Sequence, residues 1–224
     1  MKKIIIVLAT RNKGKVKEFQ ELLKDHPIEM FGLDKFGPIP EVEEDGETFD
    51  DNAYKKALFT AKVLGLPAIA DDSGLGVEAL NGAPGVKSAR YAGSGATDED
   101  NIKKLLSEMK GESNRQAAFE CVISIAVPSG PALTYEARCE GEITTEIKGS
   151  NGFGYDPVFF YPPLGKTFAE ISIEEKNKVS HRGKALAEVA SELDKIIIWL
   201  NSRLMEAMPP KPDHKEFEHN DWSE

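Results

Sequence analysis

A β-branched segment near the start of the chain most constrains what it can fold into. Residues 3–9 read Lys-Ile-Ile-Ile-Val-Leu-Ala, and a continuous apolar run of this kind is typical of a strand buried on both faces inside a sheet. Residues 13–24 follow with apolar side chains at helical spacing and end at His26-Pro27, which predicts a helix that stops before the proline. A buried strand that leads directly into a helix indicates an α/β fold.

The same segment bears on location. Its apolar stretch is far shorter than the roughly 20 residues that span a bilayer, and it continues into Thr10-Arg11-Asn12-Lys13 without the small residues of a signal-peptide cleavage site. We therefore expect a cytoplasmic protein with no membrane segment. Cys121 and Cys139 stand in apolar or strand-like surroundings without a CxxC pattern, which favours two reduced thiols in the core.

Periodicity predicts the remaining elements of one α/β domain. Helices are expected over 49–64 and 97–109, as a short helix from Ser172, and as one long helix from Ser180 to about Leu200. Strands are expected over 67–70, 116–127, 132–147 and 158–160, the second and third forming an antiparallel hairpin. Residues 28–46 are expected to be mostly extended chain and loop, and residues 80–96 to form a long structured loop. The domain is predicted to cover residues 1–207, and residues 208–224 to form a flexible acidic tail.

Charge is divided into two blocks of opposite sign. The 224 residues include 28 Lys and Arg against 38 Asp and Glu, a net charge of −10, which argues against nucleic acid or a membrane surface as a partner. Residues 1–17, however, hold six basic side chains and no acid, whereas residues 41–51 hold seven acids and no base. The basic block suits a small anionic ligand, and the acidic block suits a cation that accompanies it.

The basic block contains the predicted strand-to-helix turn Thr10-Arg11-Asn12-Lys13-Gly14-Lys15. The N-terminus of a helix presents free backbone N–H groups and a partial positive charge, which favour phosphate. Lys13 and Lys15 add full charges, and Asn12 adds an amide donor. The turn lacks the GxxxxGK[ST] pattern of a Walker A loop, but it predicts phosphate binding.

Two groups of acids are candidates for metal binding. The acidic block could supply one oxygen ligand to a hard divalent cation, although a solvated loop is the usual explanation of such a run. Asp71-Asp72-Ser73-Gly74 follows the strand predicted over 67–70, and adjacent buried carboxylates are costly unless a cation or a proton joins them. One of these carboxylates could hold Mg²⁺ and also accept a proton from an attacking water.

Two later motifs suit a flat ligand. In Gly152-Phe153-Gly154-Tyr155-Asp156-Pro157 the glycines leave space over the Phe153 ring, and Asp156 could accept a hydrogen bond from a base edge. Lys176 is followed by Ser180-His181-Arg182-Gly183 at the start of a predicted helix, where cations are electrostatically disfavoured. A ligand that uses His181 and Arg182 would explain their placement.

Together these motifs resemble those of the inosine triphosphate pyrophosphatase family, also called XTP/dITP diphosphatases. They are TxNxxK at 10–15, DDSG at 71–74, GAPGVKSARYAG at 82–93, GFGYDPVFF at 152–160 and SHRGKAL at 180–186. The resemblance covers about residues 3–205. It implies a long central mixed sheet flanked by helices in two lobes, a homodimer, and a Mg²⁺-dependent hydrolase. The implied reaction converts ITP, dITP and XTP to the monophosphate and pyrophosphate, which cleanses the nucleotide pool.

By position, the resemblance also implies residue roles. The phosphate turn would be Thr10, Asn12 and Lys15, with Arg11 where many relatives have a small residue. The metal ligands would be Glu43 and Asp72, with Asp72 also the proton acceptor. Ser73 would contact the substrate, and Lys56 would face the triphosphate. The base-stacking segment would be Phe153, Gly154, Tyr155 and Asp156. A phosphate or sugar contact would come from Lys176, and purine reading from His181 and Arg182. Ile198 and Trp199 are candidates for the dimer surface.

Three other protein classes fit the sequence less well than this family. The Maf-like nucleotide pyrophosphatases are similar in fold and reaction but lack the combined SHR and GFGYD motifs. A nucleotide-binding module without turnover would gain nothing from an unpaired acid beside phosphates. A nucleic-acid binder is opposed by the net charge and by the absence of a basic and aromatic surface pattern.

Overall fold

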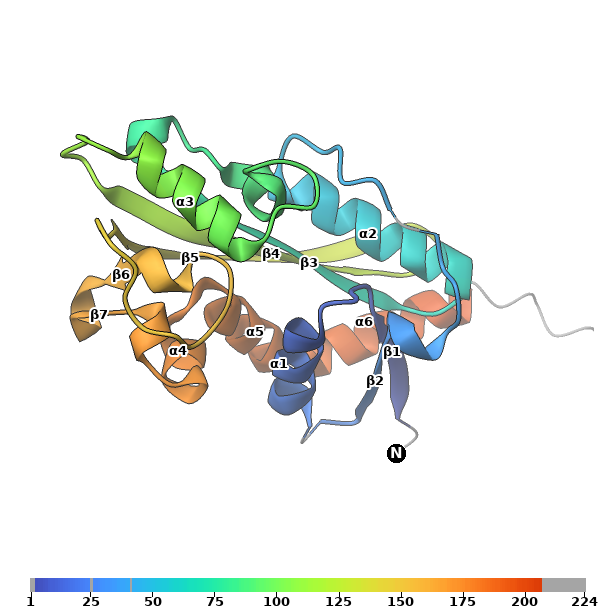
Figure 1. Cartoon of the computed structure of the whole chain (residues 1–224). Helices are drawn as coiled ribbons and strands as arrows, with labels where there is room; N and C mark the ends of the chain where they lie inside the picture. Colours follow the sequence, from blue (N-terminus) through green and yellow to red (C-terminus); the bar gives the residue numbers. More distant parts are fainter. Residues whose placement is uncertain (1–2, 25, 41, 207–224) are drawn as a thin grey trace, which may run out of the picture.

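The computed structural model describes residues 3–24, 26–40 and 42–206, which fold around one seven-stranded sheet (Figure 1). The strand order is β2-β1-β3-β4-β5-β6-β7. The strands are β1 (Ile4–Leu8), β2 (Ile28–Gly32), β3 (Ala68–Val77), β4 (Gln116–Ala126), β5 (Ala132–Ile143), β6 (Phe159–Tyr161) and β7 (Lys166–Thr167). The helices are α1 (Lys13–Leu23), α2 (Phe49–Leu64), α3 (Asp98–Glu108), α4 (Ile173–Val179), α5 (His181–Ser191) and α6 (Leu193–Glu206). The predicted mixed sheet flanked by helices is confirmed, whereas the predicted tail 208–224 lies outside the described residues.

Strand β1 is an interior strand, as predicted, with parallel partners on both sides. It pairs with β2 and with β3, and the remaining neighbours in the sheet are antiparallel. Ile6 and Leu8 join one hydrophobic cluster and Val7 joins another, so both faces are buried here. Ile5 is 40% exposed, so this double burial is confined to the second half of the strand.

Two strands differ from the prediction. Residues 28–32, for which extended chain or loop was expected, form the edge strand β2, because Ile28–Gly32 pairs with β1. The surrounding prolines and glycines obscured this strand in the sequence. The strand predicted over 67–70 continues to Val77, because all ten residues of β3 pair with β4. Asp71 and Asp72 therefore lie within a strand and not after its end.

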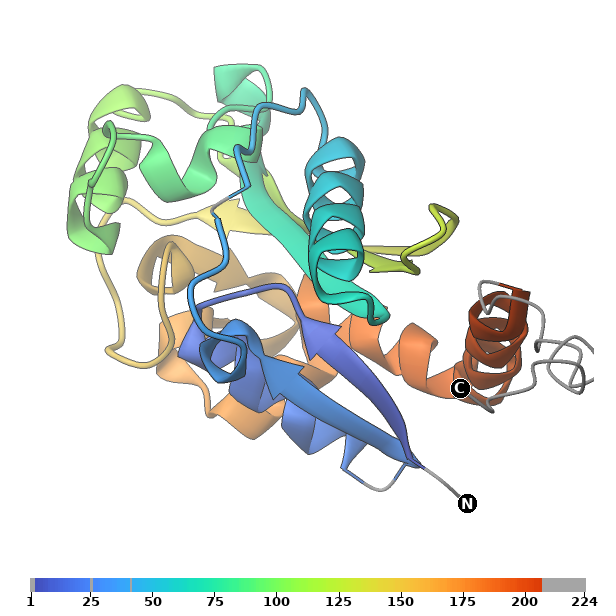
Figure 2. The same cartoon turned by 90° about the vertical axis from the view of Figure 1, so that its right-hand side faces the viewer.

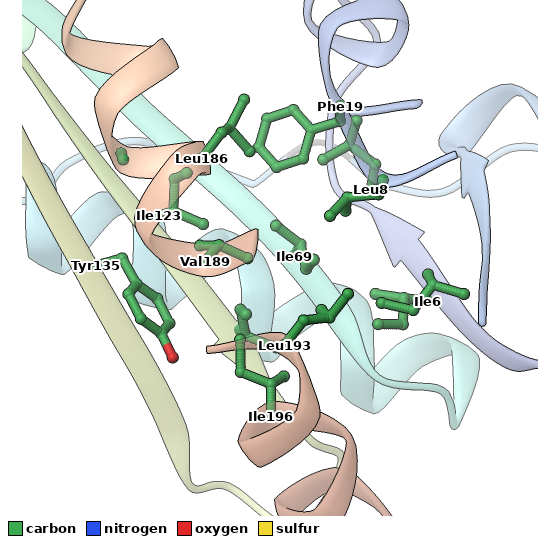
Figure 3. Packing of buried hydrophobic residues seen from close by; sticks show 14 of the residues in the cluster. Ile6, Leu8, Phe19, Ile69, Ile123, Tyr135, Leu186, Val189, Leu193 and Ile196 are labelled. Atoms are coloured by element: carbon green, nitrogen blue, oxygen red, sulfur yellow. The ribbon is translucent and has the colours of Figure 1, made fainter. Parts of the chain in front are cut away.

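Helices cover both faces of the sheet. Helix α2 lies on one face, over β3 and β4, and α5 and α6 lie on the other (Figure 2). The hydrophobic cluster on the α5 and α6 face is larger than the one under α2. Figure 3 shows that it packs Phe19 of α1 and Leu186, Val189, Leu193 and Ile196 of α5 and α6 against the sheet. Under α2 the cluster consists mainly of alanines, which bring the helix close to the strands that carry the site.

The helix predicted from Ser180 to about Leu200 is divided into α5 and α6 at Glu192. Neither Gly nor Pro stands at this break, so the helix propensities of the residues gave no indication that the helix is interrupted there. The start of α5 is tightly packed on α4, because a Cβ at Gly183 would lie 1.8 Å from the backbone oxygen of Asn177. Glycine at this position therefore allows α5 to pack closely against α4, and the two helices carry His181 and Lys176, which both line the cavity described below.

Both cysteines are buried and not bonded to each other in the described part of the chain, in agreement with the prediction of reduced thiols. Burial raises the pKa of each thiol to about 11, which suppresses the reactive thiolate. Within the described ranges, no helix has the length and apolar character needed to cross a bilayer.

Candidate active site

A cavity of about 580 Å³ is lined by residues of strands β3 and β4, of helices α1 to α5 and of the loops between them. It gathers most of the residues that the sequence singled out, from segments far apart along the chain. Those lining it are Thr10, Arg11, Asn12, Lys15, Lys56, Asp72, Ser73, Phe153, Gly154, Tyr155, Asp156, Lys176, His181 and Arg182. Gly14 and Glu43 are exposed and are not among the lining residues, and Lys13 begins α1.

The predicted phosphate turn is ordered mainly by Asn12. Its Oδ1 atom accepts hydrogen bonds from the backbone N–H groups of Gly14 and Lys15, at 2.9 and 3.2 Å, so Asn12 is the N-cap of α1. The backbone N–H of Asn12 donates in turn to Thr10 Oγ1 at 3.1 Å. These N–H groups are thus satisfied within the turn, and the positive charge that reaches the cavity comes from side chains such as Lys15.

Asp71 lies between the cationic side chains of Lys15 and Arg182, a position that could not be foreseen from the sequence. Its side chain is fully buried, and Oδ2 lies 2.8 Å from Lys15 Nζ and 3.3 Å from Arg182 Nε. Ser73 Oγ donates to the same oxygen at 3.0 Å. Burial alone would raise the pKa of Asp71, but the charges of Lys15, Arg182 and Lys56 outweigh it and hold the pKa well below its usual range. Asp71 is therefore ionised and forms ion pairs with both Lys15 and Arg182.

Asp72 points to a second group of charges, centred on Lys56. Lys56 Nζ lies 2.9 Å from Asp72 Oδ1 and 3.0 Å from Glu44 Oε1, and donates to the backbone oxygen of Asp71 at 2.9 Å. Burial raises the pKa of Asp72 above its usual value, although Lys56 opposes this. Burial would lower the pKa of Lys56, but Asp72, Asp71 and Glu44 together raise it. Asp72 thus has the higher proton affinity of the two adjacent aspartates.

The acidic block contributes Glu44 to the cavity, where the resemblance had indicated its neighbour Glu43. Arg90 holds Glu44 in place, because its Nη2 donates to the Glu44 backbone oxygen at 2.8 Å. Within the described ranges, no group of three or more His, Cys, Asp and Glu side chains gathers as a metal site. Glu44 and Asp72 nevertheless converge on one cation, the Lys56 ammonium. Two carboxylates completed by phosphate oxygens are a typical ligand set for Mg²⁺, so these side chains fit a divalent cation.

The opposite end of the cavity is aromatic. Phe153 is 38% exposed, and its ring faces Lys176 Nζ at 4.5 Å and Arg182 Cζ at 5.6 Å. Asp156, predicted to accept from a base edge, uses Oδ2 to accept from Lys176 Nζ at 2.5 Å and from the Phe153 backbone N–H at 2.9 Å. Gly152 is required beside it, since a Cβ there would lie 2.0 Å from that oxygen. Lys176 therefore belongs to the aromatic end and not to the phosphate turn.

His181 is stacked on Phe119 with the ring centroids 4.6 Å apart. It is buried, and its Nδ1 has no hydrogen-bond partner among the described residues. Burial, reinforced by the positive charges of Arg182 and Lys176, lowers the pKa of His181 well below 6.5. The imidazole is therefore neutral at physiological pH, with one ring nitrogen as donor and one as acceptor.

Tyr155 anchors the segment 153–156 to Ser88, and its buried ring is not available for a base to stack on. It is 4% exposed, and its hydroxyl donates to the Ser88 backbone oxygen at 2.9 Å. A second link runs from the Gly154 backbone N–H to Asp98 Oδ2 at 2.7 Å. In the segment 153–156, Phe153 thus presents an exposed ring while Tyr155 and Asp156 hold it in place.

Several lining residues escaped the sequence analysis. Asp98 begins a helix whose cap was predicted, so its position was visible but its contact with Gly154 was not. Phe119 lies in the middle of a predicted strand, where nothing distinguishes it from other core residues. Ser88, Arg90 and Asn101 also line the cavity without having been given a role, whereas Glu44 and Asp71 belong to acidic segments that were singled out without separate roles for these two residues.

Comparisons with known proteins identify the family of the chain. The Ham1 family model matches residues 6–192 of this sequence. The chain belongs to the Ham1 family. Its relatives in that family include proteins named dITP/XTP pyrophosphatase from Desulfotalea psychrophila, 66% identical over 98% of both chains, and from Syntrophobacter fumaroxidans, 62% identical over 91% of this chain and 88% of that protein. The resemblance drawn from the five motifs is confirmed.

Solved Ham1 structures share the fold. A HAM1 protein from Coxiella burnetii superposes with a TM-score of 0.82 at 46% identity, covering 86% of this chain and 99% of the other. The Ham1 protein from Staphylococcus aureus gives a TM-score of 0.79 at 43% identity, with the same coverage.

Proposed function

We propose that this chain hydrolyses dITP, ITP and XTP to the nucleoside monophosphate and pyrophosphate, with the help of Mg²⁺. The observation that carries the proposal is one cavity that joins two unlike groups. The Asp72–Lys56–Glu44 group suits a metal-bound triphosphate, and the aromatic group of Phe153, His181 and Arg182 suits a base. A nucleoside triphosphate has both chemistries at its two ends.

The names of the relatives support the same activity. Both of the bacterial relatives described above are called dITP/XTP pyrophosphatase, and the similarity extends over nearly the whole of each chain. At this identity the chain is an enzyme, a hydrolase that acts on nucleoside triphosphates. A homodimer, a cytoplasmic location and a role in cleansing the nucleotide pool are part of our proposal; Ile198, 69% exposed on α6, is available for a dimer contact.

The reaction transfers one proton and breaks one phosphoanhydride bond. A water oxygen forms a bond to the α-phosphorus as the bond from that phosphorus to the bridging oxygen of the β-phosphate breaks. Asp72 accepts the proton that the water loses, and its place beside Lys56 at the phosphate side of the cavity suits this role. Lys15 and Lys56 neutralise the pyrophosphate that leaves.

Glu44 and Asp72 would hold the divalent cation. When bound, it supplies positive charge to the phosphate oxygens and lowers the pKa of a coordinated water. Lys56 contacts both carboxylates, so it also limits the repulsion between them. The enzyme's own residues thus arrange charge before the substrate arrives.

Purine choice follows from the six position of the base. Hypoxanthine and xanthine carry an oxygen there, which accepts hydrogen bonds from donors on His181 and Arg182. Adenine carries an amino group instead, which would leave buried donors unpaired, and such mismatches reach discrimination of about 10⁴-fold. A neutral His181 is suited to this reading because it adds no charge beside Arg182.

The proposal is tested by pyrophosphate release from ATP, GTP, dITP, XTP, dTTP and UTP, each with and without Mg²⁺. We expect dITP and XTP to be hydrolysed fastest, and only with the metal present. If no nucleotide is hydrolysed faster than ATP, the proposed purine selectivity is wrong. Equal rates after thorough chelation of metal would remove the proposed role of Mg²⁺.

A further inference from the structure

We propose that Asp71 is a positioning residue that fixes the phosphate-side Lys15 and the purine-side Arg182 relative to each other. The inference rests on the proposed function, because it assigns these two cations to the two ends of one nucleotide. Asp71 itself is buried behind them, with 2% of its surface exposed, and acts through its neighbours.

A single carboxylate oxygen makes the connection. Asp71 Oδ2 lies 2.8 Å from Lys15 Nζ and 3.3 Å from Arg182 Nε. Lys15 comes from the first turn of α1 and Arg182 from the first turn of α5, whereas Asp71 lies in β3. Three elements that are remote in the sequence therefore meet at one atom, which lies within ion-pair distance of both cations.

The same contact aligns the purine end of the cavity. Arg182 Cζ lies 5.6 Å from the centroid of the exposed Phe153 ring, and its Nε is held by Asp71. Asp71 thus helps to hold the guanidinium beside this ring. Lys15 is aligned in the same way at the end of the phosphate turn.

The two oxygens of Asp71 have unequal surroundings. Its second oxygen, Oδ1, is buried and has no hydrogen-bond partner in the described part of the chain, and an unsatisfied buried oxygen destabilises a fold. A charge that is buried at this cost is understandable if it orders two ligand-binding cations at once. In Asp71→Asn the shape is kept, but the charge that orients both cations is lost.

The test measures the affinity of the protein for each of the two reaction products separately. Binding of dIMP and of inorganic pyrophosphate with Mg²⁺ is measured by calorimetry for the wild type and for three variants. Lys15→Met is expected to weaken mainly pyrophosphate, and Arg182→Lys mainly dIMP. Asp71→Asn is expected to weaken both ligands by about tenfold or more, because each loses a charge-oriented partner.

A control separates positioning from loss of stability. Leu200→Ala removes a fully buried side chain of α6 in the core cluster away from the cavity, and it is expected to bind both ligands as the wild type does. If Asp71→Asn weakens only one ligand, or neither, the inference is overturned. Should Asp71→Asn not fold, Asp71→Glu keeps the charge but displaces it by one methylene, and a one-sided or absent loss in that variant overturns the inference equally. A wild type that binds neither ligand also overturns the inference, whereas the proposed function is refuted only if pyrophosphate release from dITP is absent as well.

Discussion

His181 is expected to make the stability of the fold depend on pH between about 5 and 7. Burial and the nearby cations Arg182 and Lys176 lower its pKa well below 6.5 in the folded state, whereas the unfolded chain has an ordinary histidine pKa of about 6.5. As the pH falls below 6.5, the unfolded state therefore binds a proton that the folded state refuses. The contribution of His181 to stability is complete above pH 6.5 and is lost as the pH falls from there.

The magnitude follows from this linkage. One proton bound only in the unfolded state changes the free energy of unfolding by about 1.4 kcal/mol per pH unit. At pH 5.5, one unit below the unfolded pKa, the loss from His181 alone is about 1.4 kcal/mol relative to pH 7.5. The raised pKa of Asp72 acts in the opposite sense at lower pH, but it is common to the wild type and to a His181 variant.

Urea denaturation followed by circular dichroism tests this at pH 7.5, 6.5 and 5.5. His181→Gln is expected to lose about 1.4 kcal/mol less than the wild type between pH 7.5 and 5.5, since it has no imidazole to protonate. His26→Gln is the control; it leaves His181 in place and is expected to follow the wild type. Equal losses in the wild type and His181→Gln would show that His181 is protonated in the folded state, and would refute the neutral imidazole.

Three further predictions concern catalysis and packing. Asp72→Asn is expected to slow pyrophosphate release at least about 10²-fold while circular dichroism stays unchanged, since it removes the proton acceptor; full activity would contradict this role. Glu44→Gln is expected to raise the Mg²⁺ concentration that gives half the maximal rate, whereas Glu43→Gln is expected to leave it unchanged. The reason is that Glu44 and Asp72 contact the same Lys56 ammonium, while Glu43 is exposed. The reverse result would favour Glu43 as the metal ligand. Gly183→Ala is expected to destabilise the fold by about 3 kcal/mol, because its Cβ would overlap the backbone of Asn177; unfolding midpoints equal to the wild type would contradict this packing.

Local patterns predicted those elements whose signals are local. The run that became β1, the helix after it and the capped starts of α2, α3 and α4 need only neighbouring residues to be recognised. The length of β3 could not be predicted in this way. Its last seven residues, Asp71–Val77, contain two aspartates and two glycines that disfavour a strand, and pairing with β4 overrides them.

The candidate site shows the same division. Its motifs marked which segments carry chemistry, but contacts between segments decide what each side chain does. Asp71 and Arg182 are 111 residues apart in the sequence, and no spacing rule predicts their ion pair. Nor can a run of acids show that Glu44 enters the cavity while Glu43 faces outward, because that choice depends on where Lys56 and Arg90 lie.

The most direct measurement of the central claim is a competition assay in one reaction, with dITP and dATP at equal concentration and Mg²⁺ present. Phosphorus NMR follows both nucleotides and all phosphate products over time. The proposed cavity predicts that dITP disappears first, with dIMP and pyrophosphate formed in equal amounts and dATP largely intact. Consumption of both nucleotides at the same rate, or formation of dIDP and orthophosphate, would contradict it.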